Sequence, residues 1–547
     1  NIRTASESSA LFVHVKNNNH PIAWEKSLEV FISSCVTERL LVEASLIKEL
    51  KSINLTQALG HDIADMSFSR STIRRYRASG RKQAAETDRK SFSPDEPLLL
   101  HWDGKLLPDV QNTTASRIAI VVTFNGQEKL LGVPKKERET GEAQAEACLE
   151  AIKSWNVEKL VKGLVFDTTA SNTGLHRGAC VRIEDELEQE LVWIACRHHV
   201  LEIMLSDVFS LICGSTGSPE TILFKRFKKQ WRSISLNDFI PAPESMFEDP
   251  MLQILRKELL EYLPVALQDN LPRDDYREFL ELALLFLGGL PSSKVSFRVP
   301  GPTHHARWMA KGIYALKIYL FKHQFTLSTR EENNITQLAL FVSIMYVRFW
   351  HEAPMAVRAP FNDLQLMKVL KEYPHEKVAH AAQAAISRHL WYLSEHLIGL
   401  SLFDDRIDTE TKKNMVQNFQ CPKKQDFSRR IVLSDETPIS NVASFVTERT
   451  LDIFDVLTLD GKERAQLFLS KDPKTWKDDE VFIIMRDRAI NMKVVNDSAE
   501  RAIALIERYN ESITQNEDQK QYLLQVVAAH RKKLPTASKA AMMKGYK

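Results

Sequence analysis

The spacing of hydrophobic positions divides the chain into a helical beginning, a strand-rich middle and a long helical remainder. Residues 1–92 repeat apolar side chains at helical intervals, and Thr56–Met66, a polar turn and Ser71–Arg77 form a pattern typical of a helix-turn-helix. Five short apolar runs then predict buried strands. These runs are Pro97–Trp102, Arg117–Thr123, Lys129–Val133, Leu160–Phe166 and Leu191–Ala195.

The order of the elements indicates the fold of the middle region. Asn125-Gly126, between the second and third runs, is a strong hairpin signal. Helical patterns at Glu142–Trp155, Gly178–Glu190 and His198–Ile212 separate or follow the later runs. Three antiparallel strands followed by alternating helices and strands is the order of the ribonuclease H-like fold. We therefore predict an α+β chain with a mixed five-stranded sheet flanked by helices.

The same patterns predict how the chain is divided. A helical, basic region for DNA binding or dimerisation occupies residues 1–92, and the first part of the ribonuclease H-like core occupies residues 97–213. Strand signals nearly vanish after the Gly- and Ser-containing stretch at residues 214–220, so residues 220–480 are expected to form a large all-helical insertion. Residues 481–547 are expected to supply the last core helices and a basic tail.

Composition excludes several classes of protein. With 44% hydrophobic and 26% charged residues in 547, the chain is neither disordered throughout, nor collagen, nor a coiled coil. No apolar run approaches the roughly 18 residues of a membrane span, so no membrane partner is expected. Six scattered cysteines without a CxxC pair favour a reducing compartment. The first residue is Asn and no signal peptide is evident, which indicates a processed or trimmed start.

A net charge of only +2 hides three basic clusters. Arg70–Lys90 contains eight basic and two acidic residues, Leu223–Arg232 mixes five bases with aromatic rings, and Lys520–Lys547 has seven bases and no acid. Such clusters are typical of proteins that bind a polyanion, although a solvated helix face or a disordered tail also produces them. The candidate DNA-binding residues in them are Arg74, Arg75, Arg77, Lys225, Arg226, Lys228 and Lys229.

Two aspartates indicate the chemistry. Asp103 follows the first apolar run and Asp167 follows the fourth. The first and fourth strands are neighbours in a ribonuclease H-like sheet, so both carboxylates would enter one cleft. Hard oxygen ligands suit Mg²⁺ or Mn²⁺, and two such ions can promote an in-line phosphoryl displacement. For either aspartate alone, a turn or cap residue is the simpler interpretation.

Four segments together resemble the hAT (hobo/Activator-type) superfamily of DNA transposases. Val165–Gly174 resembles the second-aspartate motif, Ile194–Leu205 the Cys-x-x-His motif, His305–Leu316 the Arg-Trp segment and Asp497–Ile503 the C-terminal Glu-Arg signature. The family's usual serine after Glu-Arg-x-Phe is absent, and no Cys/His zinc-finger module precedes the core.

The resemblance implies further site residues. Glu500 would be the third acid and metal ligand, with Glu507, Asp497 and Glu480 as rivals. Residues expected near the acids are Asn172, Cys196 and His199. Cys196 and His199 could be half of a zinc site, but we expect a core cysteine and a capping or orienting histidine instead, and we predict no zinc site.

The Arg-Trp segment has two interpretations. The resemblance implies that Trp308 stacks on a base extruded beside the cleavage site and that Arg307 holds the adjacent phosphate. A tryptophan at helical spacing is equally compatible with a place in the hydrophobic core.

These observations predict a cut-and-paste DNA transposase. Its reaction would be hydrolysis of DNA at transposon ends and strand transfer, with Mg²⁺ or Mn²⁺ held by Asp103, Asp167 and Glu500. We expect a nuclear homo-oligomer that binds double-stranded DNA. The alternatives are a domesticated DNA-binding regulator without cleavage activity, a metal-dependent nuclease without strand transfer, and a structural protein of helical repeats. The absence of internal repeats argues against the last of these.

Overall fold

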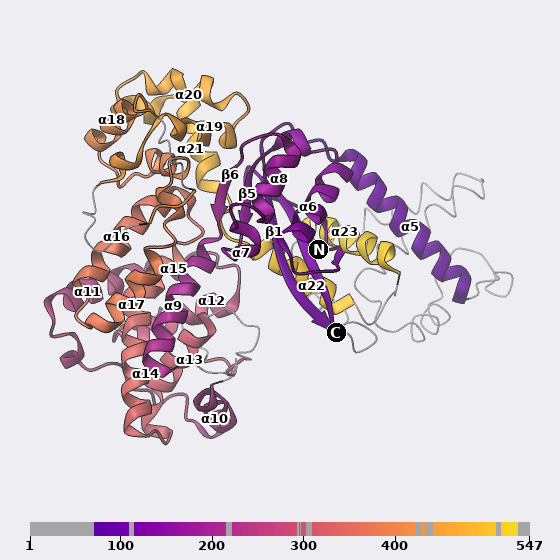
Figure 1. The fold of residues 1–547 in the computed structure, drawn as a ribbon. Helices are drawn as coiled ribbons and strands as arrows, with labels where there is room; N and C mark the ends of the chain where they lie inside the picture. Colours follow the sequence, from indigo (N-terminus) through magenta and orange to yellow (C-terminus); the bar gives the residue numbers. More distant parts are fainter. Residues whose placement is uncertain are drawn as a thin grey trace, which may run out of the picture.

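The computed structural model describes residues 70–108, 114–214, 221–292, 295, 297–301, 309–422, 429–432, 441–509 and 516–533. In these residues the chain forms two bodies side by side, one built on a β-sheet and the other all helical (Figure 1). The α+β class and the mixed sheet are thus confirmed. Thr56–Met66, the first half of the predicted helix-turn-helix, lies outside the described residues.

The sheet contains all five predicted strands and one short extra strand. The order is β3-β2-β1-β5-β6, with β4 paired to β2. β1, β2 and β3 pair antiparallel, whereas β5 pairs parallel with both β1 and β6. The strands are β1 (Leu98–Pro108), β2 (Thr114–Phe124), β3 (Gln127–Gly132), β4 (Lys135–Lys136), β5 (Val161–Phe166) and β6 (Val192–Ala195).

The hairpin between β2 and β3 forms where Asn125-Gly126 predicted it. Both residues have positive φ angles, 42° and 71°, as a two-residue type I′ turn requires. Gly reaches this region without steric cost and Asn at little cost, so the sequence fixes this turn locally.

β1 is longer than its apolar run, which corrects the expected place of Asp103. The strand continues to Pro108 because its backbone remains paired with β2 as far as Thr114. Antiparallel pairing needs only backbone groups, so it extends beyond the apolar residues that mark the strand in the sequence. Asp103 therefore lies inside β1, at the point where the pairing with β5 has ended.

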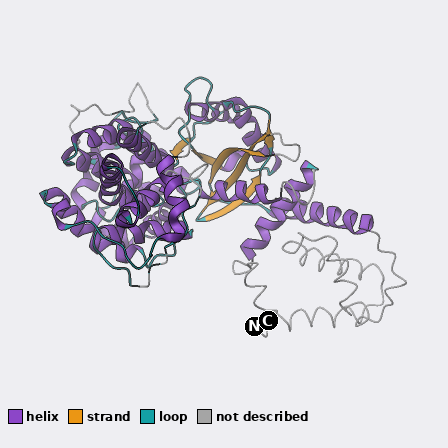
Figure 2. Ribbon diagram, turned by 90° about the horizontal axis from the view of Figure 1, so that it is seen from below, coloured by secondary structure: helices purple, strands orange, loops and turns teal. Residues whose placement is uncertain are grey.

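Helices cover both faces of the sheet (Figure 2). On one face lie α6 (Gly141–Ser154), α7 (Ala170–Thr173) and α8 (Ala179–Leu187), where the Trp102 indole donates to Gln144 of α6. On the other face, α22 (Asp497–Tyr509) packs on β1 and β2, where Ala499 and Ile503 join Ala119 in one hydrophobic cluster, and α23 (Glu517–Lys533) contacts β3 and α22. α22 and α23 follow the last strand of the sheet by more than three hundred residues, so this face of the sheet is covered by the C-terminal part of the chain.

α5 (Arg70–Ser91) is one continuous helix that lies along α23. The Arg81 guanidinium donates to Gln519 of α23, and Gln519 in turn donates to the Ala78 carbonyl. Asp88 is paired with Lys129 of β3, so the basic helix is attached to the sheet body at its middle and near its C-terminal end.

The second body is built from helices on both sides of α9 (Arg197–Cys213), which starts at the end of β6 and packs along α17 and α14 (Figure 1). α9 belongs to the range that the sequence assigned to the core, yet it lies among the insertion helices. The other helices are α10 (Ile222–Gln230), α11 (Pro250–Ala266), α12 (Asp274–Phe286), α13 (Met309–Leu320), α14 (Thr329–Phe341), α15 (Val347–His351), α16 (Ala359–Glu372), α17 (Glu376–Ile386), α18 (Thr409–Asn418), α19 (Asp452–Leu457), α20 (Gly461–Leu469) and α21 (Glu480–Asn491).

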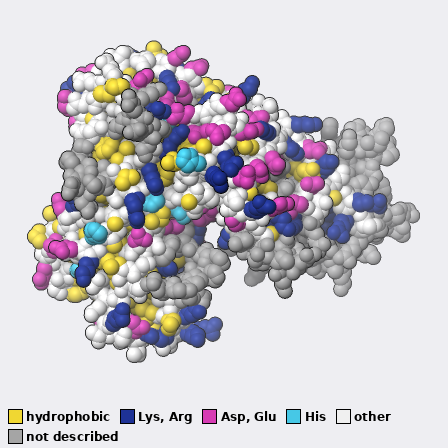
Figure 3. Space-filling model, viewed as in Figure 1, with side chains coloured by type: hydrophobic (Ala, Val, Ile, Leu, Met, Phe, Trp, Pro, Cys, Tyr) yellow, Lys and Arg dark blue, Asp and Glu magenta, His cyan; other side chains and the backbone are white. Residues whose placement is uncertain are grey.

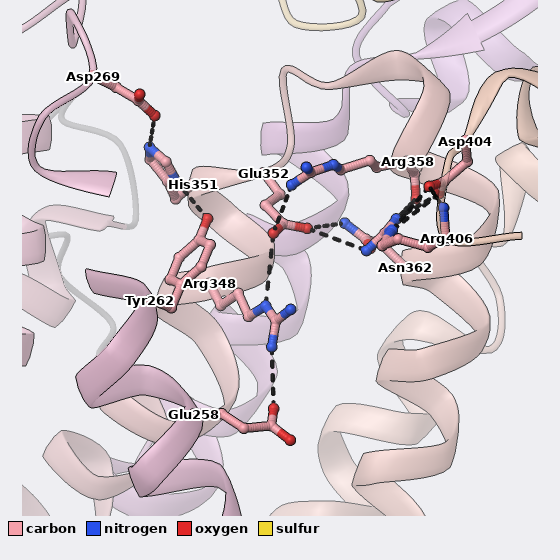
Figure 4. Close-up of polar contacts among 10 residues, drawn as sticks. All are labelled: Glu258, Tyr262, Asp269, Arg348, His351, Glu352, Arg358, Asn362, Asp404 and Arg406. Atoms are coloured by element: carbon pink, nitrogen blue, oxygen red, sulfur yellow. Dashed lines mark hydrogen bonds and ion pairs between the residues drawn. The ribbon is translucent and has the colours of Figure 1, made fainter. Parts of the chain in front are cut away.

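A buried polar network holds the middle of the helical body together (Figure 4). Glu352 is 2% exposed and lies 3.1 Å from Arg358, 3.6 Å from Arg348 and 2.8 Å from the Asn362 amide. A buried carboxylate is costly unless it is paired and hydrogen-bonded, and these partners meet that need from both sides. The network fixes α15 against α16, and α15 in turn contacts α9.

Arg117 and Glu517 join β2 to α23. The Arg117 side chain is fully buried and donates two hydrogen bonds, of 2.8 and 2.9 Å, to the Glu517 carboxylate. Burial alone would raise the pKa of Glu517, but the hydrogen bonds from Arg117 hold it below its usual value. The pair therefore stabilises the docking of α23 on the sheet.

We predict that Glu517→Gln loosens α23. The substitution leaves a buried guanidinium with half of its partner, which costs about 1–2 kcal/mol after allowance for the partial exposure of Glu517. Hydrogen exchange in α23 should accelerate about tenfold, since about 1.4 kcal/mol corresponds to one order of magnitude. Glu186→Gln, in an exposed pair with Lys153, is the matched control and should change nothing. Equal exchange in both variants would contradict the role of the buried pair.

Candidate active site

Asp103 and Asp167 occupy matching positions on neighbouring parallel strands. His101 of β1 is paired with Val165 of β5, and each aspartate lies two residues further along its strand. Directly paired residues point to the same face of a sheet, and Asp103 is paired with Ala119, which contacts α22 and α23. Asp103 therefore faces α22, whereas Asp167 follows β5 by one residue and its carboxylate contacts Thr169 and Asn172 in the segment that leads into α7.

Asp167 is held in place by its own loop. Its Oδ1 accepts hydrogen bonds from the Thr169 amide (3.0 Å), the Thr169 hydroxyl (2.6 Å) and the Asn172 amide group (2.7 Å). Asn172 is buried, and its Oδ1 accepts from the Trp102 indole at 2.9 Å. The residue that the motif indicated thus contacts Asp167 directly and ties it to the residue before Asp103.

α22 brings two further carboxylates to the sheet. Glu500 lies in its first turn, 34% exposed, with Oε2 3.7 Å from the guanidinium of Arg273, the residue before α12. Asp497 is only 14% exposed, 3.2 Å from the Tyr276 hydroxyl and 3.4 Å from His198 Nδ1. Arg273 and Tyr276 both belong to the helical body, so this body contacts the first turn of α22.

Of the other rivals for the third acid, Glu480 begins α21 in the helical body, where α21 packs with α19 and α20. The side chain of Glu507 lies outside the described residues. Asp103 thus faces α22, which itself carries Glu500 and Asp497, while the fourth acid, Asp167, is held by Thr169 and Asn172 after β5.

Asn496 is a site residue that the sequence analysis missed. It precedes α22 and is 4% exposed, with its amide group donating to the Trp102 carbonyl at 3.0 Å and its Oδ1 lying 3.3 Å from His101 Nδ1. An asparagine before a helix predicts a cap, but this side chain contacts β1 instead. The sequence analysis did not single out His101 either. This residue is fully buried, its Nε2 lies 2.7 Å from the Thr123 hydroxyl, and burial lowers its pKa to about 4.

Cys196 and the two histidines after it have separate surroundings. Cys196 is buried before α9, and its Sγ accepts from the Asn496 amide at 3.3 Å. His198 stacks on Trp350 with ring centroids 4.7 Å apart, and this imidazole reaches α22. His199, which the motif singled out, is half-buried beside His389.

Metal-ligand geometry is not preassembled in the part of the chain that the structure describes. There, no three His, Cys, Asp or Glu side chains are arranged to hold an ion. Two contacts are relevant to the three acids: Glu500 is turned towards Arg273, and Oδ1 of Asp167 is engaged by its loop.

Some of the candidate DNA-binding side chains are exposed, and others are partly buried or paired with an acid. Arg74 and Arg75 are exposed on α5, and Arg77 is partly buried. Lys225, Lys228 and Lys229 are exposed on α10, where Figure 3 shows Lys and Arg side chains gathered at the lower end of the helical body. Arg226 is instead held by Glu331 at 3.0 and 3.1 Å, so its guanidinium has a structural partner. Arg307 and Trp308 lie outside the described residues.

His389 lies close to several basic side chains, including His199. Burial lowers the pKa of His389 to about 4, and the positive charges of Arg430, Arg388 and His199 add to the effect. Arg430 also lies over the Trp391 ring, with 5.6 Å between its guanidinium carbon and the ring centroid. Basic side chains therefore gather around residues 388–391.

This pKa predicts an acid-labile contribution to stability. The unfolded chain takes up the His389 proton near pH 6.5 and the folded chain only near pH 4, so stability falls as the pH drops through that window. His389→Gln should melt closer to wild type, or above it, at pH 4.5 than at pH 7. The exposed His380→Gln on α17 is the control. A difference in melting temperature between His389→Gln and wild type that does not change with pH would refute this.

Comparisons with known proteins identify no family for this chain. No family model matches the sequence, and no curated protein matches it. None of the described helices is long and apolar enough to cross a membrane. The candidate site is therefore defined by the residues of this chain and by their arrangement.

Proposed function

We propose that the protein is a DNA transposase of the cut-and-paste kind, which resembles the hAT superfamily and depends on Mg²⁺ or Mn²⁺. The observation that carries the proposal is that Asp103 and Asp167 each lie two residues beyond the last pair of the parallel strands β1 and β5, while α22, which begins with Asp497 and contains Glu500, packs on β1. Two carboxylates in register at one sheet edge repel each other unless cations lie between them.

The topology supports a ribonuclease H-like core. Apart from β4, three antiparallel strands precede two parallel ones, and the first strand lies beside the fourth, as that fold requires. Residues 97–213 and 481–547 would supply the core, with the helices of residues 220–480 inserted before α22. The insertion would serve to hold α22, because Arg273 and Tyr276 contact its first turn.

The donor set fits a hard divalent cation. Asp103, Asp167 and Glu500 offer only carboxylate oxygens, which Mg²⁺ and Mn²⁺ prefer. A bound pair of ions would activate the attacking oxygen and stabilise the leaving oxygen of the phosphodiester. To bind an ion, the Glu500 side chain must leave Arg273 and turn towards the other acids. The 3.7 Å contact between Glu500 and Arg273 joins two partly exposed groups and is weak enough to allow this.

The chain's own residues have distinct tasks in this proposal. Thr169 and Asn172 fix the Asp167 carboxylate, while the exposed bases of α5 and α10 hold DNA phosphates. Arg307 and Trp308 would contact an extruded base and its phosphate. A nuclear homo-oligomer that brings two DNA ends together completes the proposal.

We predict that Asp103→Asn and Asp167→Asn each abolish cleavage. Losing one charge from the carboxylate pair weakens cation binding and relieves repulsion, so the variants should fold at least as stably as the parent. The assay measures nicked and joined products after incubation with Mg²⁺ and DNA carrying candidate transposon ends. Asp185→Asn, on the exposed side of α8, should retain full activity.

Two outcomes of this assay decide between the alternatives. Full cleavage by either site variant would rule out the proposed acids. Nicks without joined products in the parent protein would favour a nuclease without strand transfer.

DNA binding should depend steeply on salt. Each neutralised phosphate releases counterions, so the logarithm of affinity falls with the logarithm of salt concentration by about 0.9 per contact. The double variant Arg74→Gln, Arg75→Gln should flatten this slope by roughly 2. Lys228→Gln with Lys229→Gln tests α10 in the same way. A slope unchanged by both pairs would show that neither helix contacts DNA.

A further inference from the structure

The polar groups of Asn496 contact three segments of the chain: the start of α9, the first turn of α22 and β1. Its backbone amide donates to Cys196 Sγ at 3.3 Å, and its carbonyl accepts from the Glu500 amide at 3.1 Å. Its side-chain amide donates to the Trp102 carbonyl at 3.0 Å, and its Oδ1 lies 3.3 Å from His101 Nδ1. With 4% of its surface exposed, the residue makes these contacts away from bulk water.

Two of these contacts involve the backbone of a proposed acid or of the residue next to it. Trp102 is the residue before Asp103, so the bond to its carbonyl fixes the backbone from which that carboxylate projects. The Glu500 amide donates to the Asn496 carbonyl, a backbone hydrogen bond in the first turn of α22 that places Glu500 one turn after Asn496.

The third contact reaches Asp167 through one intermediate. Cys196 accepts from Asn496 through its sulfur, and its own amide donates to the Phe166 carbonyl at 2.8 Å. Phe166 is the residue before Asp167. One buried asparagine therefore links the three backbones that carry the three acids.

We propose that Asn496 is a positioning residue that sets the spacing of Asp103, Asp167 and Glu500 for divalent cation binding. The inference rests on the metal site of the proposed function and adds to it a residue that acts through the segments carrying the acids. The asparagine side chain supplies only the bonds to β1, at Trp102 and His101, because the contacts with Cys196 and Glu500 are made by its backbone. Without that side chain, the start of α22 can shift relative to Asp103 while each acid keeps its own local contacts.

The chemistry of the contacts calls for an amide at this position. The Trp102 carbonyl can only accept, so the NH₂ of Asn496 must face it, and Oδ1 then faces the Nδ1–H of His101. An aspartate of the same size has no donor for the carbonyl, and a leucine has neither group. A buried carbonyl left without its donor costs about 1–3 kcal/mol, which favours displacement of the helix.

The test compares two buried asparagines in the full-length protein. Asn362 is 2% exposed and donates to Glu352 at 2.8 Å in the helical body, so Asn362→Ala also removes a buried amide but lies in a different network. Mn²⁺ binding without DNA is measured by calorimetry, alongside the melting temperature. Asn496→Ala should weaken Mn²⁺ binding at least tenfold, and Asn362→Ala should leave it within twofold.

Asn496→Ser keeps a small polar side chain and serves if the alanine variant does not fold. In it, the turnover rate of cleavage should fall and the Mg²⁺ requirement should rise, whereas DNA affinity stays constant. A merely structural role would instead lower stability with no change in the Mg²⁺ requirement of the folded fraction, which would overturn the inference.

The remaining outcomes separate the inference from the proposed function. If the parent protein binds Mn²⁺ and Asn496→Ala binds it equally well, the positioning role is wrong and the metal site stands. If the parent protein binds no Mn²⁺, the metal site itself is wrong. Equal weakening by Asn362→Ala would show that any buried defect impairs the site, and would also overturn the inference.

Discussion

The parallel pairing of β1 with β5 is the constraint on which the candidate site depends. Parallel strands cannot be joined by a tight turn, so β2, β3 and α6 intervene before β5 reaches β1. The last residue pair, His101 with Val165, leaves Asp103 and Asp167 each two residues further along the chain. A slip of one residue would turn the side chains of one strand to the opposite face of the sheet.

The second requirement is the return of α22 from the end of the chain. Its apolar face packs on Ala119, and Asn496 joins its start to β1. The helical body contacts the same turn through Tyr276 and His198, whose rings pack on Trp350. The position of the turn that carries Glu500 therefore depends on the helical body as well as on the sheet.

Local signals in the sequence predicted much of the fold but fewer of the contacts. The apolar runs and the Asn125-Gly126 turn located the five main strands, because these features act over a few residues. The continuation of β1 past Asp103 was missed because pairing with β2, not apolarity, extends the strand. Asn496 was missed because its partners Trp102 and Cys196 lie about three hundred or more residues away in the sequence. The Arg273–Glu500 contact escaped prediction for the same reason.

The most direct test of the account is to locate the cation. Crystals of the protein soaked in Mn²⁺ would be measured at the manganese absorption edge, where anomalous scattering identifies the ion without reference to activity. The account predicts a peak between the carboxylates of Asp103 and Asp167, within about 2.0–2.6 Å of an oxygen of each. Full occupancy of Mn²⁺ elsewhere in the molecule, with no peak between these two carboxylates, would contradict it.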